Sequence, residues 1–136
     1  MSHRNNKNFK ETITNLEKAI SLYYENESIF NHIAEANYQL GDHKGALIAL
    51  KKAIKINPDN SVNYFQSARS KHILGDYKSS INDYSKAIKL NSGSANYYYF
   101  RAFAYLDQKD IENGCQDLDN ASKLGANTSK EMEKYC

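Results

Sequence analysis

The sequence contains no tryptophan, one proline and no long apolar run. A single proline leaves few obligatory breaks in a chain that forms helices. No apolar stretch approaches the roughly 18 residues that a membrane-spanning helix requires, so we expect no membrane span. The start of the chain is polar and basic with no apolar stretch behind it, so we expect no signal peptide, unless an upstream segment has been trimmed. Together these absences predict a cytoplasmic protein.

An excess of charge of one sign is missing as well. The 18 Lys and Arg residues are nearly balanced by 16 Asp and Glu residues, which gives a formal net charge of +2. A balanced chain exerts little long-range attraction on nucleic acid or on an acidic membrane. Hydrophobic residues make up 40% and charged residues 25% of the chain, as in an ordinary soluble domain. We therefore expect neither nucleic acid nor membrane as a partner.

Catalytic and metal-binding motifs are absent from the sequence. It contains no GxxxxGK[ST], HExxH, CxxC or GxSxG pattern, and its carboxylates are scattered without a paired site. The four histidines have no cysteine or carboxylate partner at metal-ligand spacing. We predict a protein that is not an enzyme and binds no cofactor or metal. An enzyme or a nucleic-acid binder is the weaker alternative.

The chain does contain an internal repeat. The turn at residues 75–77, GDY, recurs as GDH at residues 41–43 and as KDI at residues 109–111, so its three aspartates recur at one constant period. A period of about 34 residues is typical of stacked helix pairs. Apolar residues recur at helical spacing before and after each turn, which predicts a first helix and a second helix in every unit.

The residues of the turn suit the end of one helix and the start of the next. Gly75 suits a left-handed residue that closes the first helix, and Asp76 suits the N-cap of the second. Lys109 stands at the glycine position of the third turn, where a left-handed lysine is strained by on the order of 1 kcal/mol. Alanines recur in register at places where we expect the helices to cross closely. They are Ala34, Ala68 and Ala102 in the first helices, and Ala19, Ala53, Ala87 and Ala121 in the second helices.

The repeat predicts one all-α domain, because neither helix of a pair buries its second apolar side without a neighbouring pair. The expected parts are a frayed, flexible N-terminus at 1–7, a half repeat at 8–26 that has only a second helix, complete repeats at 27–60, 61–94 and 95–128, and a C-terminal capping tail at 129–136. We expect seven main helices and a short one at the C-terminus.

This pattern resembles the tetratricopeptide repeat over nearly the whole chain. The matching residues are Phe30, Tyr64 and Tyr98 for the aromatic of the first helix, Ile33-Ala34, Ser67-Ala68 and Arg101-Ala102 for the pair that follows it, Ala46, Ser80 and Gly114 for the small residue of the second helix, and Pro58 for the closing proline, which the later copies lack. The resemblance implies a right-handed α-solenoid of stacked antiparallel helix pairs. The end of the chain is similar to the terminal repeats of some bacterial members.

The resemblance also implies a function. In the family, the first helices line a concave groove, which here implies a scaffold or interaction module that binds a peptide or helix of a partner protein. The implied groove residues are Asn31, Glu35, Tyr38, Phe65, Arg69, His72, Tyr99, Phe100, Phe103 and Leu106. We expect a partner with apolar anchors and an acidic group for Arg69. In the alternative, Phe65, Tyr99 and Phe103 belong to the core.

One known ligand class of the family does not suit this sequence. Chaperone-binding members clamp a C-terminal carboxylate with Lys, Asn and Arg side chains. The matching positions here are Asn31, Glu35, Gln66, Asn96 and Phe100, which include no cation. We therefore predict no tight binding of acidic chaperone tails.

The N-terminal half repeat is a second candidate interface. Its helix lacks the first helix that normally covers it, and Phe9, Ile13, Leu16 and Ile20 supply apolar area. The expectation is a weak homodimer, or a self-assembling adaptor that acts through this face. The alternative is that these residues all point into the first complete repeat and leave a monomer.

The two cysteines admit two interpretations. Cys115 occupies the position of Ile13, Leu47 and Ile81, so it is most simply a small core residue. If the C-terminal tail folds back over the last second helix, Cys136 meets Cys115 and a disulfide closes the loop between them. In a reducing cytoplasm both thiols remain free.

Overall fold

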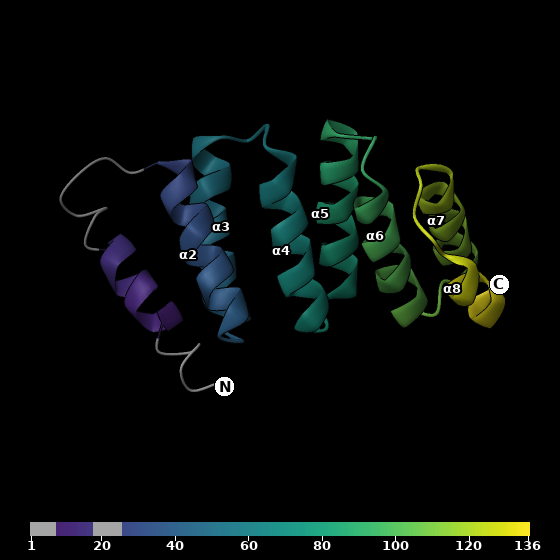
Figure 1. Cartoon of the computed structure of the whole chain (residues 1–136), viewed down its shortest axis with the longest axis horizontal. Helices are drawn as coiled ribbons and strands as arrows, with labels where there is room; N and C mark the ends of the chain where they lie inside the picture. The colour runs from purple at the N-terminus through teal and green to yellow at the C-terminus, as the bar shows by residue number, and fades with distance from the viewer. Residues whose placement is uncertain (1–7, 18–25) are drawn as a thin grey trace.

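The structure is a computed structural model that describes residues 8–17 and 26–136, and all the regular elements in these ranges are helices. The N-terminal helix, described over residues 8–17, is followed by seven more. These are α2 (Glu27–Gln39), α3 (His43–Ile56), α4 (Ser61–Ile73), α5 (Tyr77–Leu90), α6 (Ala95–Asp107), α7 (Ile111–Lys123) and α8 (Ser129–Tyr135). They stack in a row, with the N-terminal helix at one end and α8 at the other (Figure 1). The predicted seven main helices and short last helix are confirmed, and the fold is an all-α helical-repeat solenoid.

The turns between first and second helices have the predicted conformation. Residues with positive φ end the first helices, with 83° at Gly41, 87° at Gly75 and 67° at Lys109. The aspartate that follows each of them accepts a hydrogen bond from the backbone N–H three residues further on, at 2.9, 3.4 and 3.3 Å in chain order. Each aspartate therefore caps a second helix. The left-handed lysine expected at position 109 is confirmed.

The register alanines lie where helices cross. Six of the seven are in the described residues and all six are buried, namely Ala34, Ala53, Ala68, Ala87, Ala102 and Ala121. Ala19 lies outside the described residues. Because alanine has only a methyl side chain, the backbones of neighbouring helices approach closely at these points.

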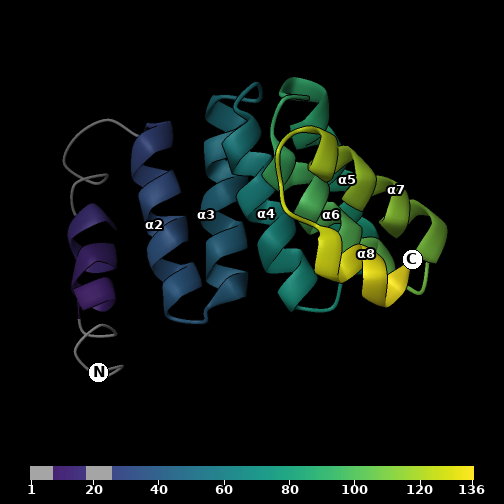
Figure 2. The same cartoon turned by 45° about the vertical axis from the view of Figure 1, so that its right-hand side comes forward.

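The core consists of clusters of buried residues that follow one another along the stack. Leu50, Phe30 and Ile33 are buried between α2 and α3, and Leu16 of the N-terminal helix packs against this cluster. At the other end, Met132 and Tyr135 of α8 pack against the cluster that contains Ala102, Leu106 and Leu118 of α6 and α7. Figure 2 shows α8 lying against these two helices.

The helix α8 occupies the place of another first helix. Met132 follows Tyr98 by one repeat period, so it stands in the register of the aromatic residue of each first helix. Cys136 likewise stands in the register of Ala102. The C-terminal tail therefore covers α6 and α7 in the way that each first helix covers the pair before it.

Candidate functional site

The first helices α2, α4 and α6 lie side by side and form one face of the protein, here called the groove face. Polar side chains link α2 to α4 across it. Asn31 donates through Nδ2 to Asn63 Oδ1 and to Gln66 Oε1, both at 2.7 Å. Glu35 accepts through Oε1 from Gln66 at 3.1 Å. Two of the predicted groove residues are therefore occupied with hydrogen bonds inside the protein.

A carboxylate begins this network at the start of α2. Glu27 accepts hydrogen bonds from the side-chain amides of Asn57, Asn60 and Asn63, at 3.0 Å for Asn57 and 2.6 Å for Asn63. Burial raises the pKa of the Glu27 carboxyl, but the three donors outweigh burial and the pKa is lowered from its ordinary value. Glu27 therefore ties α2 to the next repeat in its ionised form.

Arg69 is also engaged within the protein. Its guanidinium bonds Glu35 Oε1 at 3.2 Å and lies over the ring of Tyr38, 4.1 Å from the centroid. The second carboxylate oxygen of Glu35, Oε2, accepts a hydrogen bond from Gln39 Nε2 at 2.8 Å. A guanidinium that is paired and stacked is a poor receptor for an acidic ligand. The expectation that Arg69 holds an acidic group of the partner is not supported by these contacts.

Several residues assigned to the groove contribute to the core, among them Phe65 and Leu106. Phe65 is half-buried, and its ring packs with those of Tyr84, Tyr97 and Phe100 at centroid distances of 5.9, 4.9 and 5.4 Å. Leu106 is only 6% exposed. The assignment of Leu106 to the groove surface is wrong, because the side chain lies over Gly114 of α7, where even a Cβ atom would meet it at 2.7 Å.

Two further predicted groove residues, Tyr99 and Phe103, lie on α6 and pack against the core cluster of α6 and α7. Tyr99 and Phe103 are half-buried and their rings pack edge to face at 5.0 Å. The hydroxyl of Tyr99 donates to Glu131 of α8 at 3.2 Å. Burial, followed by the hydrogen bond to Glu131, raises the pKa of Tyr99. Helix α8 therefore borders the aromatic end of the groove face.

Between these two regions is a depression of about 230 Å³, here called the aromatic hollow. Its lining consists of Tyr38, Arg69, His72, Ile73, Tyr84, Phe100 and Phe103. His72 also hydrogen-bonds through Nε2 to Asp107 Oδ2 at 2.7 Å. Ile73, Tyr84 and Asp107 were not among the predicted groove residues. Two of them could have been found from the repeat, because Ile73 and Asp107 occupy the same repeat position, at the end of their first helices.

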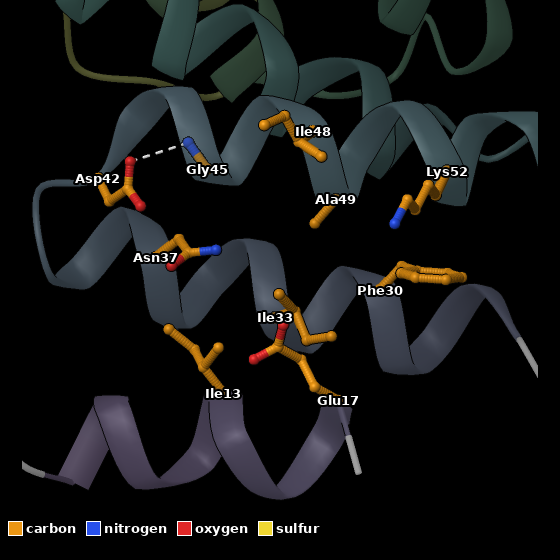
Figure 3. Close-up of a pocket in the computed structure, with 10 residues that line it drawn as sticks. All are labelled: Ile13, Glu17, Phe30, Ile33, Asn37, Asp42, Gly45, Ile48, Ala49 and Lys52. Atoms are coloured by element: carbon orange, nitrogen blue, oxygen red, sulfur yellow. Dashed lines mark hydrogen bonds between the residues drawn. The ribbon is translucent and has the colours of Figure 1, made fainter. Parts of the chain in front are cut away.

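A larger pocket of about 450 Å³ lies between the N-terminal helix, α2 and α3 (Figure 3). Ile13 and Glu17 point into it from the N-terminal helix, and Ile33 and Ala49 face it from α2 and α3. Leu16 packs on the core of the first repeat, and Ile20 lies outside the described residues. Phe9 is half-buried. These positions favour the alternative in which the N-terminal apolar residues point into the first repeat, over the proposed self-association face.

The next repeat has a polar counterpart of this pocket. Ser67 and Asp83 stand one repeat period after Ile33 and Ala49. Asp83 Oδ2 accepts from the Ser67 hydroxyl at 2.7 Å and pairs with Lys71 at 2.8 Å. The same crevice between repeats is thus apolar in one place and ionic in the next.

In the third repeat a buried ion pair occupies the equivalent place. Arg101 donates through Nε and a terminal nitrogen to the two oxygens of Asp117 at 2.7 and 2.8 Å, and through its other nitrogen to Ser85 at 3.0 Å. Asp117 is 2% exposed. Burial lowers the pKa of Arg101, but the hydrogen bonds and charge of Asp117 outweigh it and the net pKa is raised. This pair is structural and is not available to a ligand.

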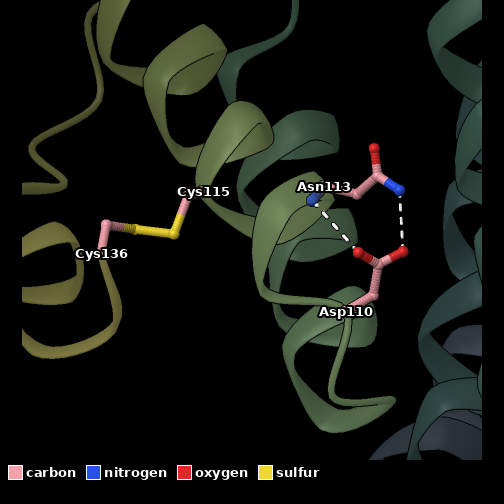
Figure 4. The surroundings of a disulfide bond; sticks show 4 residues. All are labelled: Asp110, Asn113, Cys115 and Cys136. Carbon is pink, nitrogen blue, oxygen red and sulfur yellow. Dashed lines mark hydrogen bonds between the residues drawn. A yellow bond between two sulfur atoms is a disulfide. The ribbon is translucent and has the colours of Figure 1, made fainter.

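The structure has the disulfide between Cys115 of α7 and Cys136 at the end of α8, with the two Cα atoms 5.9 Å apart (Figure 4). In the two preceding repeats, Leu47 and Ile81 stand at the position of Cys115. The covalent bond therefore lies where a second helix elsewhere meets the next first helix through apolar packing. It fixes α8 beside Tyr99.

Within residues 8–17 and 26–136, no three His, Cys, Asp or Glu side chains lie close enough together to hold a metal ion. None of the helices in these ranges has the length and apolar character needed to cross a membrane.

Two repeat-family profiles match the sequence. The profile described as tetratricopeptide repeat matches residues 28–60, and the one described as TPR repeat matches residues 68–109. The chain belongs to the tetratricopeptide-repeat family. The matched ranges contain both glycine turns and end at Lys109, the first residue of the third turn. The period and the register alanines therefore placed this tetratricopeptide-repeat protein correctly in its family. A comparison with curated protein sequences found no match.

Solved structures share the fold. The crystal structure of MamA superposes with a TM-score of 0.84 at 16% identity, over 90% of this chain and 71% of MamA. YrrB, described as a TPR protein with an unusual peptide-binding site, superposes with a TM-score of 0.81 at 22% identity, over 88% of this chain. The chain spans only 61% of YrrB. The first TPR of Spaghetti (RPAP3), bound to the HSP90 peptide SRMEEVD, gives 0.77 at 19% identity, over 80% of this chain and 89% of that one. At these identities the likeness establishes the fold.

Proposed function

We propose that this protein is a non-enzymatic interaction module that binds a peptide or helix of a partner protein on its groove face. The observation that supports the proposal is the aromatic hollow, which is open on the face formed by the first helices and is lined mainly by rings. Aromatic surfaces that remain accessible are favoured anchors for partner side chains. The YrrB and RPAP3 structures, whose descriptions refer to peptide binding, are consistent with this use of the fold.

The position of the anchor follows from the contacts on the groove face. Between α2 and α4, Asn31, Glu35 and Gln66 already bind one another. A ligand there would have to break these bonds. Phe103 and Ile73, by contrast, offer apolar surface without a polar partner to displace, and Ile73 is 54% exposed. We therefore assign the principal contacts to the half of the groove face that contains α4 and α6.

The same contacts disfavour binding of an acidic chaperone tail. Asn31 and Gln66, two of the positions that correspond to the clamp, are engaged with each other, and Glu35 beside them is anionic. A terminal carboxylate would meet repulsion from Glu35 and no free cation at these positions. We expect no measurable binding of the peptide SRMEEVD.

A selection experiment tests the proposed function. Random phage-displayed peptides are selected on the full chain, and the enriched peptides are synthesised and measured by fluorescence anisotropy. Replacing Phe103 by Ala is expected to weaken binding by about tenfold or more, as for a central anchor. Ile111→Ala on α7 is the matched control, because Ile111 is also apolar and 44% exposed but lies on a second helix. Circular dichroism establishes that both variants fold.

Two outcomes would refute the proposal. One is a selection that enriches no peptide on the parent protein. The other is a set of peptides whose affinity is the same for the parent, for Phe103→Ala and for Ile111→Ala, since the binding site would then lie elsewhere.

The disulfide bears on the compartment in which the protein works. Stable disulfides are typical of oxidising compartments, whereas the cytoplasmic location expected from the sequence predicts free thiols. Because Cys115 and Cys136 are joined in the structure, we propose an oxidising location. Trapping free thiols by alkylation during lysis of the source cells, followed by mass spectrometry, tests it. Recovery of the doubly alkylated chain would support the cytoplasmic alternative.

A further inference from the structure

The charges around the aromatic hollow are not equally accessible. The side chains of Arg69 and His72 are 21% and 17% exposed, whereas those of their partners Glu35 and Asp107 are 38% and 51% exposed. In both pairs the side chain of the base is the more buried partner and the carboxylate is the more exposed one. A ligand that approaches the hollow therefore meets negative charge first.

Of the two carboxylates, Asp107 has more capacity left. Both oxygens of Glu35 accept hydrogen bonds, from Gln66 and Arg69 on Oε1 and from Gln39 on Oε2. Among the described side chains, Asp107 has a single hydrogen-bond partner, His72, which uses Oδ2. A carboxylate offers about four acceptor sites on its two oxygens. Asp107 can therefore bind a further donor without giving up its contact with His72.

The backbone adds to this negative character. Asp107 is the last residue of α6 and Ile73 is the last residue of α4, so two helix C-termini meet beside the hollow. A helix C-terminus carries a partial negative charge and favours cations within its last turn. Lys71 and His72 lie in the last turn of α4, whereas no basic residue lies in the last turn of α6. The last turn of α6 therefore has no basic residue of its own, and the base that meets Asp107 is His72 of α4.

The size of the hollow limits what enters it. At about 230 Å³ it is smaller than the 300 to 1,000 Å³ typical of pockets that enclose a drug-sized molecule. A single apolar side chain is a suitable occupant for a depression of this size whose lining is mainly rings. The charge beside it then selects the neighbouring residue of the ligand.

We propose that the aromatic hollow binds one apolar side chain of a partner peptide, and that an adjacent Lys or Arg of the same peptide pairs with Asp107. This inference rests on the proposed function, because it names the chemistry of the ligand for the same groove face. It replaces the acidic group expected from Arg69 by a basic one. The partner is thus a segment in which apolar and cationic residues are neighbours.

Three synthetic peptides test the charge preference. They are versions of one peptide selected on the full chain, identical except that the residue beside the apolar anchor is Lys, Gln or Glu. Affinity is expected to fall in that order. Asp107→Asn keeps an oxygen that accepts from His72 but removes the charge, so it should weaken the Lys peptide by about two- to fivefold, the range of an exposed ion pair, and leave the Gln peptide unchanged. The Lys preference should shrink at high salt.

Glu112→Gln on α7 is the matched control, since Glu112 is an exposed carboxylate on a second helix. It should change the affinity of no peptide. The cation proposal is overturned if the Glu peptide binds best, or if Asp107→Asn and Glu112→Gln have the same effect on the affinity of the Lys peptide. In either case the proposed function still stands, provided that peptide binding still depends on Phe103. Loss of the dependence on Phe103 would instead overturn both.

Discussion

Replacement of Arg101 by isoleucine tests how the crevices between repeats are stabilised. The variant leaves the carboxylate of Asp117, which is 2% exposed, without the guanidinium that donates to both of its oxygens. Removing one partner of a buried ion pair costs about 3 to 5 kcal/mol. A chain of this length has a total stability of about 7 to 20 kcal/mol. The single substitution should therefore lower the urea midpoint strongly.

The repeat itself provides the compensating change. In the first crevice, Ile33 and Ala49 stand where Arg101 and Asp117 stand in the third. The double variant Arg101→Ile/Asp117→Ala copies that apolar pair. Because an apolar replacement of a buried ion pair is often neutral or stabilising, we expect the double variant to lie within about 1 kcal/mol of the parent protein.

Urea unfolding followed by circular dichroism, with Asp117→Ala completing a double-mutant cycle, measures these values. The end of a repeat protein can unfold separately from the rest, which would change the dependence of the unfolding free energy on urea concentration. The four free energies are therefore comparable only if this slope is equal in all four proteins. The reasoning is wrong if Arg101→Ile costs less than about 1 kcal/mol, or if the double variant is as unstable as the single one.

Three further predictions concern the turn, the packing and the pH dependence. Lys109→Gly should stabilise the protein by about 1 kcal/mol in urea unfolding, because φ is 67° at this residue; no gain would contradict the strain. Gly114→Ala should destabilise it by about 1 to 3 kcal/mol in the same assay, because the added Cβ meets Leu106 at 2.7 Å; a neutral effect would mean that Leu106 moves freely. The pKa of Glu27 is lowered from 4.5 in the folded protein, so its contribution to stability is present above that pH and is lost as the pH falls through the folded value. Glu27→Gln should therefore be less stable than the parent at neutral pH, with a difference that shrinks in acid; a constant difference would exclude the linkage.

The contacts of individual side chains separate what the sequence predicts from what needs the structure. The predicted N-cap of Asp76 is confirmed, as are the left-handed turn residues and the buried alanines. These features depend on a few neighbouring residues, so local backbone preferences are sufficient to predict them. The exposure of Leu106 was predicted wrongly, because it depends on how closely α7 approaches at Gly114. The pairing of Arg69 with Glu35 was not predicted, because Glu35 lies in the preceding repeat, far away in the chain.

The sequence alone determined that this protein is a stack of helix pairs in the tetratricopeptide-repeat family, because a constant period of turns, caps and alanines has few other physical solutions. Only the tertiary structure decided which groove residues remain open to a ligand. The period places Glu35, Arg69 and Phe103 at the same position of their first helices. Their surroundings differ, because Glu35 and Arg69 pair with each other whereas Phe103 is a half-buried ring. The open charge of Asp107, the occupied charge of Arg69 and the bond between Cys115 and Cys136 all arise from contacts between residues that are distant in the chain.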